Sequence, residues 1–245
     1  MSKSLQLNLK VALFDSDFFA LQSLNSYMAW DRRTRVTFST NSLEQLFGYF
    51  QTTPDAELPD VLVMDADHIG GAEALTKTLR RLRGMIEPLV VICLAQSIER
   101  ELIEASAEAG ARAYLLKQDV QLQITWAIIY ALDYEFLVTS SLRQECKQSF
   151  NSRIYNAQVL PPQREYPEMT ERIRQAIKLC VIEGMPAHLA ADEMGISLHT
   201  IRGYIKEGYR ILEAYDHTQY PTDMTPQERA FMRFTALADD SALSS

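Results

Sequence analysis

The chain has 245 residues, of which 47% are hydrophobic and 23% charged, which is ordinary for a globular protein and allows one large domain or two smaller ones. No apolar run reaches membrane-spanning length and the first residues lack a signal-peptide pattern, so we expect a cytoplasmic protein with no membrane partner. The formal net charge of −8 argues against indiscriminate nucleic-acid binding over the whole surface, but it allows a local basic helix.

The cysteines and histidines give no sign of a metal centre or a disulfide framework. Cys93, Cys146 and Cys180 are far apart and odd in number, and the four histidines are equally scattered. We therefore expect the cysteines to be small buried hydrophobic residues and expect no zinc chemistry.

Short apolar segments alternate with helical segments through the first half of the chain. Strands are predicted at 9–15, 35–39, 61–65, 88–95 and 113–117, and helices at 18–28, 42–51, 73–83, 99–110 and 121–134. Strict alternation of five strands and five helices predicts a five-stranded parallel sheet with helices on both faces, in a flavodoxin-like α/β fold.

Three polar residues fall at the carboxyl ends of the predicted strands. Asp15 ends the first, Asp65 ends the third and Lys117 ends the fifth. Because sites in open parallel sheets lie at these strand ends, we expect the three side chains to share one crevice. Carboxylates suit Mg²⁺ and an ammonium suits phosphate oxygens, so the cluster indicates phosphoryl chemistry.

The segments "VALFDSD", "PDVLVMDADHIGG" and "AGARAYLLK" resemble the receiver domain of two-component response regulators, over roughly residues 8 to 135. The resemblance implies that Asp65 accepts a phosphoryl group from a histidine kinase and that Lys117 contacts the phosphate. It also implies that the acidic residues after the first strand hold Mg²⁺.

The sequence departs from that family where the acid pocket and its relay are built. Ser16 stands where a second acid is usual, and Asp17 is displaced by one residue. At the switch positions, Ala95 replaces the usual hydroxyl residue, whereas the aromatic Tyr114 is retained. The hydroxyl that would follow a bound phosphoryl group is therefore missing.

Asp65 consequently has several interpretations: a working phosphoacceptor, part of a receiver that no longer depends on phosphorylation, a polar strand end or an unrelated ligand site. Asp67 adds a carboxylate two residues on, which would either contact Mg²⁺ or repel a phosphate. The candidate metal ligands are thus Asp15, Asp65 and Asp67, and Mg²⁺ is the only cofactor considered.

Residues 142–169 are polar, contain a Pro-Pro pair and lack periodicity, which is typical of a linker. We therefore predict a receiver-like domain at 1–138, a linker at 139–168 and a second domain at 169–245.

The second domain has the pattern of a helix-turn-helix. A helix beginning near Thr170 should stop at Gly184, a second begins at Pro186 and ends at Gly195, and Ser197 should cap a third. The apolar residues Ile201, Ile205, Tyr209 and Leu212 form one stripe along that third helix. In this all-α layout the third helix enters the DNA major groove.

Arg202, Lys206 and Arg210 recur every four residues and place three cations along one side of the third helix. His199 and Tyr204 flank them, and Gly203 allows close approach to DNA. The competing interpretation is an ordinary solvated helix face, because residues 164–215 hold seven Lys and Arg against eight Asp and Glu.

The segment from Thr170 to Ala214 resembles the LuxR/NarL-type DNA-binding domain, although sigma-factor-like modules share the pattern. The resemblance makes Arg202, Gly203 and Lys206 base-facing, and Thr200 and Tyr204 contacts to the DNA backbone. Gly208 is expected to weaken this helix by about 1 kcal/mol relative to alanine, and Glu207 adds an anion.

A further helix is predicted at 225–237, capped by Thr225, either packed on its own domain or contacting a second subunit. The acidic, serine-rich end is expected to be disordered.

The sequence thus predicts a DNA-binding transcription regulator, an atypical LuxR/NarL-type response regulator whose receiver-like domain controls dimerisation and DNA binding independently of phosphorylation. A conventional regulator phosphorylated at Asp65 by a histidine kinase is the first alternative. The second is a protein-binding adaptor, and an enzyme on the flavodoxin-like fold is disfavoured because no phosphate loop, nucleophile elbow or dinucleotide fingerprint is present. We expect a homodimer bound to double-stranded DNA.

Overall fold

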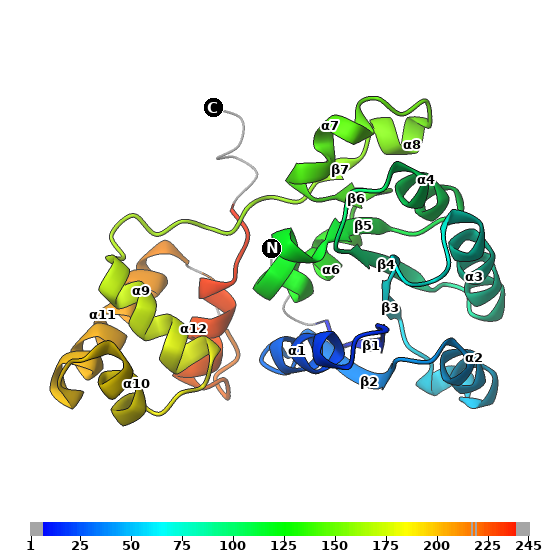
Figure 1. Ribbon diagram of the computed structural model, residues 1–245. Coiled ribbons are helices and arrows are strands. Elements are labelled where there is room, and N and C mark those ends of the chain that lie inside the picture. The colour runs from blue at the N-terminus through cyan, green and yellow to red at the C-terminus, as the bar shows by residue number, and fades with distance from the viewer. Residues whose placement is uncertain (1–6, 217, 219, 239–245) are drawn as a thin grey trace. The chain divides into compact units, whose positions relative to one another are not determined.

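The computed structural model describes residues 7–216, 218 and 220–238, and the chain divides into two compact units between Pro162 and Gln163 (Figure 1). No helix within these residues is long and apolar enough to span a membrane.

The first unit is built on a sheet of seven parallel strands in the order β2-β1-β3-β4-β5-β6-β7. The strands are β1 (Leu9–Phe14), β2 (Thr34–Thr40), β3 (Val61–Asp65), β4 (Val90–Ala95), β5 (Ala113–Leu116), β6 (Leu137–Val138) and β7 (Gln158–Val159). All five predicted strands are present, but the predicted count of five is wrong. Two strands of two residues each extend the sheet beyond β5, and segments this short carry no periodic signal.

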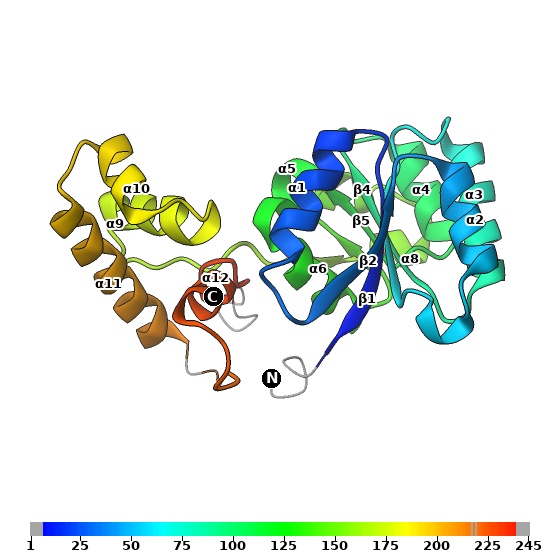
Figure 2. The ribbon, with the colours of Figure 1, turned by 90° about the horizontal axis from the view of Figure 1, so that it is seen from below.

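Helices cover both faces of the sheet, as expected (Figure 2). On one face lie α1 (Phe18–Met28), the short α5 (Lys117–Val120) and α6 (Ile124–Ala131), and on the other lie α2 (Leu43–Thr52), α3 (Ala72–Met85) and α4 (Arg100–Glu108). Every residue of β3 is buried, which explains its uninterrupted apolar sequence. Short 3₁₀ turns lie at Asp55–Glu57, Gln121–Gln123 and Ser140–Leu142.

The segment predicted as a linker is largely part of the first unit. It forms α7 (Arg143–Cys146), α8 (Ser152–Tyr155) and β7, which pairs with β6. Leu142, Cys146 and Ile154 are 0%, 3% and 1% exposed and belong to the main core. The boundary predicted at 138 is therefore wrong. The apolar residues of this segment are too irregularly spaced to show a helical or strand period, yet they dock on the sheet beyond β5.

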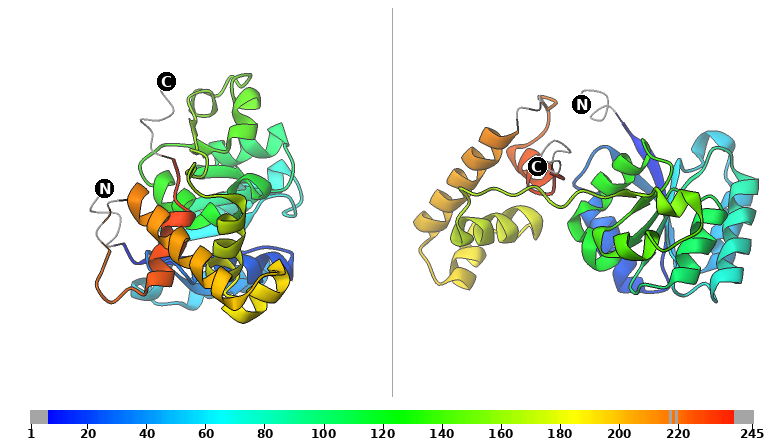
Figure 3. Two further views of the ribbon diagram at one scale, coloured as in Figure 1. Left: turned by 90° about the vertical axis from the view of Figure 1, so that its left-hand side faces the viewer. Right: turned by 90° about the horizontal axis from the view of Figure 1, so that it is seen from above.

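The second unit contains α9 (Glu171–Ile177), a π-helical turn (Lys178–Ile182), α10 (Ala187–Met194), α11 (Leu198–Tyr215) and α12 (Pro226–Phe234) (Figure 3). The predicted stops and caps are present. Gly195 ends α10 in the left-handed conformation with φ of 64°, and the Ser197 side chain accepts a hydrogen bond from the Thr200 amide. The predicted helix-turn-helix is therefore α10, the turn and α11.

The last helix packs on its own unit. Thr225 and Glu228 form a reciprocal capping box, and all residues from Ala230 to Phe234 are buried. This agrees with core packing, although the helix ends at Phe234 and not at residue 237. The end that was predicted to be disordered lies outside the described residues.

Gly208 has a packing role that sequence reasoning missed. It is buried on α11, and a Cβ atom there would lie 2.5 Å from Ile177 Cγ1 of α9. The glycine expected only to weaken the helix thus lets α9 and α11 approach closely.

Candidate functional sites

The crevice at the carboxyl ends of β1, β3 and β5 brings together the three predicted side chains. Lys117 Nζ donates to Asp15 Oδ2 at 2.7 Å and to Asp65 Oδ1 at 2.9 Å. Both carboxylates are 1% exposed. Burial lowers the pKa of Lys117, but the hydrogen bonds and charges of Asp15 and Asp65 outweigh this effect and raise it above the ordinary value. The ammonium therefore stays charged between the two acids.

His68 also contacts Asp65, and sequence reasoning did not single it out. Its Nδ1 lies 2.7 Å from Asp65 Oδ2, within hydrogen-bond distance. The hydrogen bond and the charge of Asp65 raise the pKa of His68 above its ordinary value. Ser16 Oγ lies 3.5 Å from the same oxygen. Both oxygens of Asp65 are thus engaged within the protein, and the position of His68 three residues after Asp65 was the available signal.

The acids proposed as Mg²⁺ ligands all accept hydrogen bonds within the protein. Asp67 Oδ2 accepts from the Gln96 amide at 2.5 Å, and Asp17 Oδ1 accepts from the Phe19 amide at 2.8 Å as the cap of α1. Within the described part of the chain, no three His, Cys, Asp or Glu side chains gather as a metal site. Asp15 and Asp65 both accept from Lys117, so any Mg²⁺ held by these two carboxylates would share them with the ammonium group.

The two switch positions lie close to this crevice. Ala95 ends β4 and is fully buried. Tyr114 of β5 is 0% exposed, and its hydroxyl has no hydrogen-bond partner among the described residues. Burial strongly raises the pKa of Tyr114, so the phenol remains neutral. In the register of β4 and β5, Tyr114 lies opposite Cys93, and Ala95 lies opposite Leu116.

The second candidate site is the exposed face of α11. Arg202, Gly203, Lys206 and His199 are exposed, whereas Thr200 and Tyr204 are half-buried. The hydroxyl of Thr200 lies 2.8 Å from Ser197 Oγ, and Tyr204 packs against the small core formed with α10. The structure therefore separates the six residues into four that face solvent and two that also hold the turn and the core.

Arg210 differs from the other two cations of the predicted row. Its guanidinium pairs with Glu207 at 2.7 Å and with Glu168 at 3.6 Å. Arg202 and Lys206 have no such partner among the described residues. The cationic surface of α11 is consequently concentrated on its first half.

No protein-family model matches the chain, and no curated protein matches it. Among solved structures, the chain is similar to the response regulator RcsB of Salmonella typhimurium, with 15% identity, 97% of each chain covered and a TM-score of 0.48. It is also similar to RcsB in a structure of two RcsB dimers bound to two parallel DNAs, with 16% identity, 82% of this chain and 89% of that chain covered, and a TM-score of 0.48. The receiver domain of NarL from Mycobacterium tuberculosis is 17% identical and covers 52% of this chain and 98% of its own, with a TM-score of 0.43. At such distances, function has to be argued from the sites themselves.

Proposed function

We propose that the chain is a DNA-binding transcription regulator in which α11 enters the major groove and the α/β unit controls binding. One observation carries this proposal. Arg202 and Lys206 lie one helical turn apart on α11, and both are exposed and have no acidic partner among the described residues. Arginine and lysine at this spacing suit phosphates and guanine edges.

The surroundings of the two cations support the same function. Gly203 lies beside Arg202, and an added Cβ there would have no heavy atom within 4 Å. The helix backbone is therefore accessible at the point where it would approach a base pair. The Ser197 cap and the half-buried Tyr204 hold the first turns of α11 in place. A well-fixed helix with two unpaired cations is what base readout requires.

The test is selection of a binding sequence from random double-stranded DNA with the full-length protein, followed by fluorescence anisotropy on the selected duplex. Arg202→Ala and Lys206→Ala are each expected to weaken binding at least tenfold and to reduce the salt dependence of the affinity. Arg229→Ala on α12 removes an equal charge from a helix outside the motif and should leave the affinity within about twofold. No DNA retained at low salt would overturn the proposal and favour the adaptor.

We infer further that the α/β unit acts without phosphorylation at Asp65. Lys117 and His68 engage both oxygens of Asp65, and Ala95 offers no hydroxyl. A carboxylate that attacks phosphorus needs a counter-charge for the incoming phosphate. Here the counter-charge is already shared between two acids. The conventional regulator with Asp65 as phosphoacceptor is the alternative.

The intact mass of the protein after exposure to acetyl phosphate and Mg²⁺ distinguishes the two modes. In phosphorylation, an Asp65 oxygen would bond to phosphorus as the bond from phosphorus to acetate breaks and acetate leaves. We expect no added phosphoryl group in the native protein or in Asp65→Asn. One phosphoryl group gained by the native protein alone would establish the alternative and make a histidine kinase the expected partner.

We propose that the regulator binds DNA as a homodimer with half-sites about one helical turn apart. Because α12 is buried in its own unit, it has little surface left for a second subunit. Dimerisation is accordingly assigned to the α/β unit. Sedimentation of the full chain with the selected duplex should give two chains per site, and one chain per site would contradict a dimer.

A further inference from the structure

Three arginines converge on a small cavity at the end of the sheet opposite Asp65. Arg83 comes from α3, Arg112 precedes β5 and Arg153 comes from α8. The start of β4 and Gly110 complete the wall, and the cavity measures about 290 Å³. Because β4 and β5 begin here and end near Asp65 and Lys117, the two sites lie at opposite ends of the parallel strands.

The three guanidinium groups are fixed by main-chain carbonyl groups. This anchoring orders three flexible side chains around one space and lowers the entropy cost of binding a ligand there. The donors and acceptors are Arg83 Nη1 to Ala109 O at 3.2 Å, Arg112 Nη1 to Tyr134 O at 2.9 Å, and Arg153 Nη2 to Ala111 O and to Glu135 O, each at 2.8 Å.

The charge of this cluster is not balanced. Against three arginines the lining has one acid, Glu135, so the formal sum is +2. Glu135 lies 3.4 Å from Arg153 Nε, but its side chain is 79% exposed. Burial and the charges of Arg112 and Arg83 lower the pKa of Arg153, and Glu135 only partly offsets them. The cluster is therefore short of negative charge.

Capping of a helix explains only part of this arrangement. Arg83 and Arg153 donate to carbonyl groups at and just beyond the carboxyl end of α4, where the helix dipole supplies about half a negative charge. That amount is well below the excess of two positive charges. Arg112 contacts no carbonyl of α4 and instead donates to Tyr134 O.

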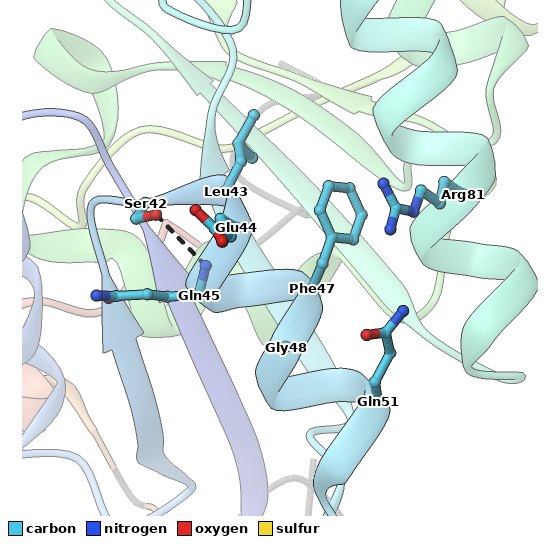
Figure 4. A pocket seen from close by; sticks show the side chains of 8 residues that line it. All are labelled: Ser42, Leu43, Glu44, Gln45, Phe47, Gly48, Gln51 and Arg81. Carbon is cyan, nitrogen blue, oxygen red and sulfur yellow. Dashed lines mark hydrogen bonds between the residues drawn. The ribbon is translucent and has the colours of Figure 1, made fainter.

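A larger hollow between α2 and α3 shows the contrast (Figure 4). There the Arg81 guanidinium lies 3.8 Å over the ring of Phe47, and the lining holds one acid, Glu44, for this one arginine. Its charges are balanced, so it gives no reason to expect a charged ligand.

We propose that the three-arginine cavity binds a small phosphate-bearing anion with two or more negative charges. Guanidinium groups bind phosphate through paired hydrogen bonds, and the volume lies at the lower limit of small-molecule sites. Such an anion would bridge α3, the start of β5 and α8. It would thereby join the segment that leads to the second unit to the body of the sheet.

The test is isothermal titration calorimetry of the full chain with pyrophosphate at low ionic strength. Native protein should bind one equivalent, and Arg112→Gln should weaken the affinity at least tenfold. Arg80→Gln removes an exposed charge from the same helix as Arg83 and should bind as the native protein does. Equal binding by all three proteins would show that pyrophosphate only associates with the positive surface, and it would overturn the proposal.

Glu135→Gln provides a test that does not depend on a destabilised protein. Removal of the competing carboxylate should tighten pyrophosphate binding several-fold, and unchanged affinity would contradict the site. Arg202→Gln excludes binding at α11, because it should leave the affinity unaltered; loss of binding in this variant would move the anion to the DNA-binding helix. Inorganic phosphate should bind more weakly than pyrophosphate, and equal affinity would contradict the requirement for a multiply charged ligand.

Discussion

At the carboxyl ends of the strands, Lys117 lies between two buried carboxylates. On α11, by contrast, the cations Arg202 and Lys206 face solvent without an acidic partner among the described residues. The first arrangement is closed, since the ammonium group and both carboxylates bind one another within the fold. The second leaves its charges available to another molecule. A resemblance between sequences does not reveal this difference, because it depends on which side chains meet and on how much water reaches them.

The largest expected effect comes from removing the Lys117 ammonium group from between the two buried carboxylates. Lys117→Met leaves Asp15 and Asp65 buried without their counter-charge and should lower the free energy of unfolding by about 3 kcal/mol. Lys206→Met, the matched change on α11, should alter it by less than about 0.5 kcal/mol. Urea denaturation followed by circular dichroism measures both. Equal effects would show that the crevice is no more closed than the helix surface.

The pH dependence of that stability sharpens the same point. The pKa of Lys117 is raised in the folded protein, so its contribution is fully present below the unfolded value of about 10.4. The contribution is lost as the pH rises through the folded value. The difference in stability between native protein and Lys117→Met should therefore shrink above about pH 10.4. A difference that stays constant to higher pH would contradict the ion pairs.

A second comparison lies within α11, whose two faces hold one glycine each. Gly208→Ala places a Cβ 2.5 Å from Ile177, while Gly203→Ala places one in open space. Both changes gain the same helix propensity, so the difference in unfolding free energy isolates the overpacking, about 1–3 kcal/mol. Thermal denaturation of the two variants measures this difference. Indistinguishable stabilities would mean that α9 shifts to make room for the added Cβ at little cost in free energy.

The smallest effect concerns His68 at the rim of the crevice. Its pKa is raised, so the bond to Asp65 stabilises the fold below about pH 6.5 and is lost as the pH rises through the folded value. Titration of the imidazole by NMR should show a pKa above 6.5 that returns to the ordinary range in Asp65→Asn. Asp67→Asn, which removes a more weakly acting charge, should change it less. An ordinary pKa in the native protein would mean that the contact does not persist.

Much of the fold follows from local patterns. Apolar runs of strand length and strong caps at Thr170, Ser197 and Thr225 lead to the five main strands and to the helix-turn-helix. The structure of the segment 137–160 was not predicted because its two strands have two residues each and its buried side chains follow no period. The structure of this segment depends on packing against the sheet beyond β5, which is a tertiary contact and not a local sequence preference.

The candidate sites were predictable to a similar extent. Asp15, Asp65 and Lys117 meet because the carboxyl ends of parallel strands lie on the same side of the sheet. The alternation of strands and helices in the sequence was enough to predict this arrangement. The contact of His68 with Asp65 and the turning of Asp67 toward Gln96 depend on the conformation of one loop. The cluster of Arg83, Arg112 and Arg153 joins residues distant in sequence, and no spacing rule indicates it.

The π-helical turn Lys178–Ile182 changes how residue numbers relate to helix faces at the carboxyl end of α9. The Glu183 amide donates to Lys178 O, five residues back, and Gln227 of α12 donates to the Cys180 carbonyl at 3.0 Å. A turn of this kind contains one residue more than an α-helical turn. Counting in steps of 3.6 from α9 would therefore misplace the last residues of this turn around the helix axis. Residues 183–186 are not helical, so the faces of α10 and α11 have to be counted afresh from their own first residues.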